Sequence, residues 1–145
     1  KIFLRKSGFP GMKVLGFAFD SLGDNDHLPH NYDRNCIVYT GTHDNDTALG
    51  WFSHAGDAQK DFAKRYLNLN DNEGFHWGMI RGVQSSTAVL AIVPMQDYLG
   101  LGSEARMNTP STLGGTNWQW RMKAGAASYE LIQKIAALTA LYSRA

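Results

Sequence analysis

The chain has 145 residues, of which 43% are hydrophobic and 19% are charged, and its formal net charge is +1. This composition is typical of one globular domain and excludes a disordered polypeptide. The small net charge excludes a strong field for nucleic acid or for a membrane surface, so neither is expected as a partner. No run approaches the roughly 20 apolar residues that span a bilayer, and the first residues lack a signal-peptide pattern. A lone cysteine, Cys36, lies in an apolar run where burial is expected, and a cytoplasmic location follows as the expectation.

The first residues predict a helix over residues 1–7, because Gly8 and Pro10 follow it and such residues stop helices. The chain therefore starts inside an element, and it starts without an initiator methionine. From these two features we expect it to be a fragment of a longer protein.

Three short apolar runs predict strands. They are nearly continuous instead of alternating, and they are rich in β-branched or aromatic residues, which is typical of strands covered on both faces of a parallel sheet. The runs lie at residues 13–19, 36–39 and 88–93. We expect three buried parallel strands.

Helical patterns fill much of the remaining chain. Two predicted helices, over residues 57–67 and 70–83, provide the long crossover that a parallel connection requires, and residues 70–73 resemble a capping box. Ser128 can cap a last helix that we expect on the outside of the sheet. Residues 98–119 have no periodicity, and a loop of this length is usually functional or disordered. Strand, loop and helix in repeated order indicate an α/β fold of the (β/α) barrel type, although three strands cannot close a barrel.

The densest polar cluster, residues 40–47, directly follows the second predicted strand. Residues at the carboxyl ends of barrel strands face the active site, so Asp44 is the first candidate for chemistry, with a turn-capping carboxylate as the alternative. His43 could bond a ligand hydroxyl, act as acid or base, or be structural. Asp46 fits better as the cap of a short helix. A metal site built from these three residues and His54 stays open on residue type, although the spacing matches no calcium loop or zinc signature.

Two further polar clusters follow the other predicted strands. The first contains Asp20 and the acid- and histidine-bearing residues 24–32, and the second comprises residues 96–98, 106–110 and 117–121. Their aromatic, amide and charged groups suit a polyhydroxylated ligand. The alternatives are a solvated connection for the first cluster and packing of the two tryptophans against the fold for the second. The sequence has neither a phosphate-binding glycine loop nor a nucleophile elbow.

Five segments together resemble the amylomaltases, the 4-alpha-glucanotransferases of glycoside hydrolase family 77, in order and in spacing. They are residues 8–15, 28–32, 38–47, 106–110 and 117–122. The resemblance covers essentially the whole chain. It implies that residues 1–145 are the C-terminal part of a (β/α)8 TIM barrel, with the three strands as its sixth, seventh and eighth.

The resemblance also implies a reaction: transfer of α-1,4-glucan segments between malto-oligosaccharides with retention of configuration. Retention requires a carboxylate nucleophile and a carboxylic acid/base. By the same resemblance both lie upstream of this chain, so we expect the chain alone to be inactive. No metal and no organic cofactor are expected.

Site residues follow from the matched motifs. Asp44 corresponds to the family's third catalytic carboxylate, which holds donor-sugar hydroxyls and stabilises the oxocarbenium-like transition state. His43 resembles the sugar-contacting histidine beside it, and Asp20 and Asn108 lie where the family has further glucan contacts. Glucan substrates are thus the expected partners.

An incomplete barrel exposes two strand edges and an apolar face, so the isolated chain is expected either to self-associate across those edges or to rearrange. Two other functions stay open at this point. One is a non-catalytic module that binds glucan or a protein partner, and the other is a hydrolase of the same family that prefers water to an acceptor glucan.

Overall fold

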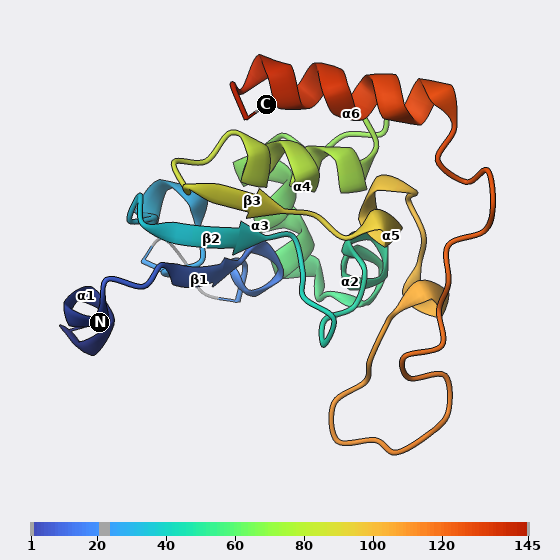
Figure 1. Cartoon of the computed structure of the whole chain (residues 1–145), viewed down its shortest axis with the longest axis horizontal. Coiled ribbons are helices and arrows are strands. Elements are labelled where there is room, and N and C mark those ends of the chain that lie inside the picture. The colour runs from blue at the N-terminus through green and yellow to red at the C-terminus, as the bar shows by residue number, and fades with distance from the viewer. Residues whose placement is uncertain (1, 21–23, 145) are drawn as a thin grey trace.

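The computed structural model describes residues 2–20 and 24–144, apart from the side chains of Ile2 and Arg5. Its centre is a parallel sheet in the order β1-β2-β3, formed by β1 (Gly11–Val14), β2 (Cys36–Tyr39) and β3 (Leu90–Ile92) (Figure 1). The predicted α/β class with three parallel strands is therefore confirmed. The helices are α1 (Ile2–Ser7), α2 (Ala48–His54), α3 (Asp57–Leu67), α4 (Phe75–Gln84), α5 (Met95–Tyr98) and α6 (Tyr129–Leu141).

Two of the predicted strands have different bounds. The run at residues 13–19 was expected to be one strand, but β1 ends at Val14 and a 3-10 turn, Leu15–Phe17, follows it. The turn keeps one backbone bond to the neighbouring segment, from Gly16 N to Thr40 O at 3.1 Å. The third strand is likewise shorter than residues 88–93. Both predictions were too long because the apolar run continues beyond the residues that pair in the sheet.

The crossover between β2 and β3 contains the two expected helices. The bounds predicted for α3 are confirmed, and the helix stops where Asn68 adopts a left-handed conformation with φ 53°. The second helix begins at Phe75 and not at the predicted capping box. Asn70 Oδ1 instead accepts a bond from Glu73 N at 3.0 Å, which makes a separate turn before the helix.

One face of the sheet carries the core. Val38 at the centre of β2 is fully buried and packs in a cluster with Leu15 and with Met79 and Val83 of α4. Figure 1 shows α3 and α4 together on this side of the sheet. Burial of these side chains, worth roughly 1.5–3 kcal/mol each, holds the helices to the strands.

The opposite face of the sheet is open. Met12, Leu90 and Ile92 are 60%, 48% and 37% exposed, and the pairing of the strands places them on one face. The prediction that the strands are covered on both faces is therefore wrong for this chain. Val14 lies on the same face and is fully buried, so the face is open over only part of its area.

The last helix lies against α4 and not directly on the sheet (Figure 1). Ser128 caps it as predicted, since its Oγ accepts a bond from Leu131 N at 3.2 Å. Lys134 Nζ lies 4.0 Å from the ring centre of Trp77 on α4. Arg144, just past the helix, donates to the carbonyls of Gln84, Ser86 and Ala88.

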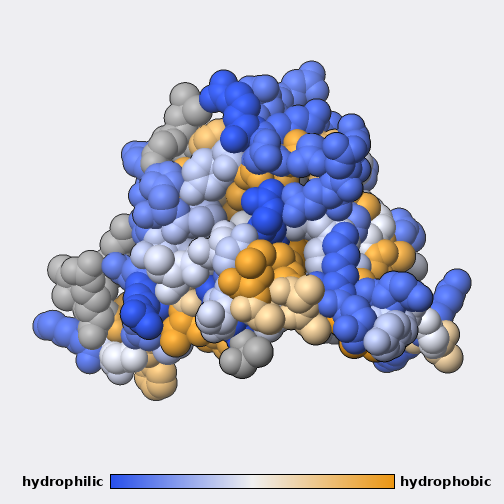
Figure 2. Space-filling view, turned by 90° about the horizontal axis from the view of Figure 1, so that it is seen from above, coloured by the Kyte–Doolittle hydropathy of each residue, from blue (hydrophilic) through white to orange (hydrophobic). Residues whose placement is uncertain are grey.

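The surface seen from above in Figure 2 is mostly hydrophilic, with hydrophobic patches between the polar side chains. On α6 no residue is buried, and Tyr129, Ile132 and Leu141 are its exposed large hydrophobic residues. Across residues 2–20 and 24–144, no helix combines the length and the apolarity needed to cross a bilayer.

Candidate functional site

The loop after β2 is a tight turn built by Asn45. Its Oδ1 accepts bonds from Thr42 N at 2.9 Å and from Thr42 Oγ1 at 2.8 Å, while Asn45 N donates to Thr42 O at 3.1 Å. This turn leaves the two residues between them, His43 and Asp44, with side chains that are 57% and 49% exposed. Both therefore point out of the fold at the carboxyl end of the sheet.

Asp44 is joined to a segment that lies 64 residues further along the chain. Asn108 Nδ2 donates to Asp44 Oδ1 at 2.6 Å, and Asn108 N donates to His43 O at 3.0 Å. Arg106 holds the two segments together: its Nη2 donates to Asp44 O at 2.7 Å and its Nε to Asn108 O at 2.9 Å. Three of the four predicted site residues thus form one group.

His43 lies between a carboxylate and an aromatic ring. Its Nε2 is 3.5 Å from Asp44 Oδ2, and its ring centre is 5.1 Å from that of Trp118. Trp118 is 54% exposed and has a left-handed backbone (φ 62°), and its N–H donates to Met107 O at 2.7 Å. The long loop therefore presents an aromatic ring beside the imidazole, which the packing interpretation of the tryptophans did not anticipate.

Asp20, the fourth predicted residue, lies elsewhere. Its Oδ1 accepts a bond from Gln59 Nε2 in the first turn of α3, at 2.5 Å. Asp20 borders, with Asn45 and Asp46, a hollow of about 190 Å³. In the described part of the chain no hydrogen bond joins it to Asp44 or to Asn108. The structure does not bring Asp20 into the main group.

Asp46 does not cap α2, contrary to the prediction. Thr47 is the cap, because its Oγ1 accepts a bond from Gly50 N at 3.0 Å. Asp46 accepts from Thr47 N at 2.8 Å and from Ser103 Oγ at 2.6 Å. A Cβ on Gly50 would lie 2.3 Å from Asp46 Oδ1, so glycine is required there for the carboxylate to lie against the helix.

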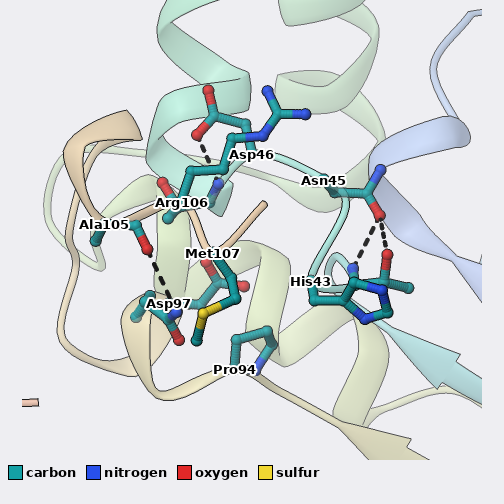
Figure 3. A pocket seen from close by; sticks show the side chains of 11 residues that line it. His43, Asn45, Asp46, Pro94, Asp97, Ala105, Arg106 and Met107 are labelled. Carbon is teal, nitrogen blue, oxygen red and sulfur yellow. Dashed lines mark hydrogen bonds between the residues drawn. The ribbon is translucent and has the colours of Figure 1, made fainter. Parts of the chain in front are cut away.

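A pocket of about 200 Å³ lies behind this loop (Figure 3). His43 and Asn45 border one side of it, while Arg106 and Met107 come from the long loop. The volume is below the range of roughly 300–1,000 Å³ usual for a complete ligand site. This volume alone is too small to hold a drug-sized ligand.

A buried carboxylate, Asp97 on α5, forms the floor of this region and is 2% exposed. Its Oδ2 accepts a bond from Thr40 Oγ1 at 2.5 Å and its Oδ1 accepts from Ala48 N at 2.7 Å. Burial raises the pKa of this carboxyl above its usual value, and the two hydrogen bonds partly oppose that rise. The sequence placed Asp97 in a polar cluster after the third strand but gave it no role.

The side chains considered for a metal site, those of His43, Asp44, Asp46 and His54, do not point toward one common position. His54 Nδ1 is 3.8 Å from Asp46 Oδ2 but only 2.9 Å from Gly50 O of its own helix. Among the described residues no group of three or more His, Cys, Asp or Glu side chains could hold a metal ion. Cys36 is buried, and burial raises the pKa of its thiol, which agrees with the structural role expected for it.

Comparison with known proteins decides the family. Residues 1–127 match the family model of glycoside hydrolase family 77, described as 4-alpha-glucanotransferase. The chain belongs to this family. A 4-alpha-glucanotransferase from Clostridium butyricum is 52% identical over 98% of the chain and 29% of the relative, and one from Thermus thermophilus is 48% identical over 85% and 26%.

A solved family member supports the fold. The amylomaltase from Streptococcus agalactiae in complex with acarbose superposes with a TM-score of 0.94 at 38% identity, over 99% of this chain and 29% of that one. The expectation that the chain is part of an amylomaltase TIM barrel is thereby confirmed. The chain spans less than a third of these relatives. The identities and the covered shares give no support to the expectation that the chain is the C-terminal part of the barrel.

Proposed function

We propose that this segment forms the sugar-binding wall of a 4-alpha-glucanotransferase that moves α-1,4-glucan segments from one malto-oligosaccharide to another. The observation that carries the proposal is the Asp44–Asn108 bond at the carboxyl edge of the sheet, within a chain that belongs to the family. Catalytic residues in barrel enzymes lie at this edge.

Asp44 is the proposed transition-state carboxylate. Glucan transfer with retention passes through a transition state in which positive charge develops at the anomeric carbon. A fixed carboxylate near that charge stabilises it more than it stabilises the neutral ground state. Asn108 donates to Oδ1 of Asp44, and His43 Nε2 lies 3.5 Å from Oδ2, which is the oxygen that we assign to a donor-sugar hydroxyl.

His43, Asn108 and Trp118 complete the proposed sugar contacts. His43 Nε2 can donate to a sugar hydroxyl, and the amide of Asn108 has a carbonyl oxygen that can accept from one. Trp118 offers a half-exposed aromatic face beside the imidazole. Asp20, in the neighbouring hollow, would contact a sugar more distant from Asp44.

The nucleophile and the acid/base belong to parts of the barrel outside this chain. The proposed chemistry uses carboxylates and hydrogen bonds alone, so it needs neither a metal nor an organic cofactor. The segment therefore contributes binding and charge stabilisation to an active site that several parts of the barrel share.

The test uses the full-length protein that contains this segment, incubated with maltotriose alone. Disproportionation predicts glucose together with maltopentaose and longer products, measured by chromatography over time. Glucose and maltose without longer products would mean that the protein is a hydrolase. Binding of maltotriose without any product would mean that it is a non-catalytic glucan-binding module.

A further inference from the structure

One buried carboxylate holds both ends of the loop that carries the site. Asp97 Oδ2 accepts from the hydroxyl of Thr40, the first residue after β2, and Asp97 Oδ1 accepts from the backbone N–H of Ala48, the first residue of α2. The segment between these two contacts is residues 41–47, which includes His43 and Asp44. The carboxylate thus lies at the closure of a short loop.

The contacts are well placed to act as an anchor. Asp97 and Thr40 are both 2% exposed, so water does not compete for their bond. The donor at Ala48 is one of the N–H groups that a helix cannot satisfy within itself, and an acid at that position also meets the positive end of the α2 dipole. Within the described residues, the other acid that faces this region is Asp46, which bonds Ser103 and Thr47.

The carboxylate is 2% exposed and each of its oxygens already accepts a bond from the protein, so we assign it a structural role and no direct sugar contact. The exposed side of the loop is restrained separately by Arg106, through Asp44 O. The loop that carries Asp44 is therefore held at its two ends by Asp97 and at its exposed side by Arg106.

We propose that Asp97, through Thr40 and Ala48, is the positioning residue that fixes Asp44 for glucan transfer. This inference rests on the proposed function of Asp44. A displacement of about 1 Å in a reacting group costs roughly 100-fold in rate, so loss of the anchor reduces turnover more than it reduces substrate binding.

The test compares two substitutions in the full-length protein. Thr40→Val has the same shape but no hydroxyl, whereas Thr40→Ser keeps the hydroxyl. We expect Thr40→Val to lower kcat on maltotriose by roughly 10–100-fold with KM changed less than about threefold, and Thr40→Ser to stay within about threefold of wild type in both. Acarbose binding by calorimetry counts the folded sites, and both variants should bind as many acarbose molecules per chain as the wild-type protein.

Hydrogen exchange provides a readout that does not depend on activity. Thr40→Val should accelerate exchange of amides in residues 41–48 and leave those of α4 unchanged. Asp97→Ala should do the same more strongly, because it removes both contacts. The proposal is overturned if kcat falls equally in Thr40→Val and Thr40→Ser, if the loss matches a loss of acarbose sites, or if exchange over residues 41–48 is unchanged.

Failure of the proposed function gives a different pattern. If wild-type protein does not disproportionate maltotriose, the role of Asp44 in glucan transfer is wrong whatever the variants do. If wild-type protein is active and Thr40→Val keeps wild-type kcat, only the anchoring role of Asp97 is wrong.

Discussion

At the scale of single residues, the site depends on contacts between segments far apart in sequence. Asp44 alone is a half-exposed carboxylate in a turn, with many possible orientations. The bond from Asn108 and the backbone contact from Arg106 restrict those orientations. A charge that is already oriented stabilises a transition state without reorganising during the reaction, which is why such contacts matter for rate.

Asn108→Ala should therefore lower kcat/KM on maltotriose in the full-length protein. The change removes a charge-assisted bond, worth roughly 1.5–3 kcal/mol, which corresponds to about 10–150-fold in rate. Steady-state kinetics measures the effect. Asn72→Ala, at an exposed position in the turn before α4, is the control and should behave like wild type. Equal kinetics for the two variants would show that the amide does not orient Asp44.

Among the helices and strands, the sequence predicted the elements with regular periodicity well, but it predicted the ends of several elements poorly. The apolar stripe of α3 and the β-branched run of β2 gave correct bounds because a single pattern fills each element. The strand predicted from Lys13 onward was too long, because Leu15–Phe17 is as apolar as a strand but forms a 3-10 turn that leaves the sheet. The predicted N-cap of α2 was also wrong, because Asp46 and Thr47 are adjacent and both are favourable capping residues.

The candidate site shows the same division. Asp44 and His43 were identifiable because they follow a buried strand at the carboxyl edge of the sheet. The bond between Asp44 and Asn108 was not, since composition and spacing carry no information about which loops meet in space. Asp97 was missed as an anchor for the same reason, because its two partners lie 57 and 49 residues away.

At the scale of the whole molecule, the segment exposes more surface than a compact protein of its size. Its accessible surface is 8,743 Å². A folded monomer of 16.1 kDa is expected to expose about 7,400 Å². In the described ranges β1 and β3 each pair only with β2, and the face with Met12, Leu90 and Ile92 is open. Open edges and exposed apolar faces favour association between chains.

The 145-residue segment on its own is therefore expected to self-associate and to lack transferase activity. Light scattering after size-exclusion chromatography measures the first, and the maltotriose assay measures the second. Ile92→Lys should reduce association because it puts a charge on the open face, whereas Leu141→Lys on α6 should not. A monodisperse, active monomer would contradict both expectations.

The kinetics of Asp44→Asn in the full-length protein test whether Asp44 stabilises the transition state of glucan transfer. Asparagine keeps the size of the side chain and an oxygen that can accept from Asn108, so the fold and acarbose stoichiometry should be preserved. Loss of the charge should lower kcat on maltotriose by roughly 100–1,000-fold. Asp61→Asn, at an exposed position of α3, should leave kcat unchanged. An Asp44→Asn protein that disproportionates maltotriose at the wild-type rate would show that the charge of Asp44 does not stabilise the transition state.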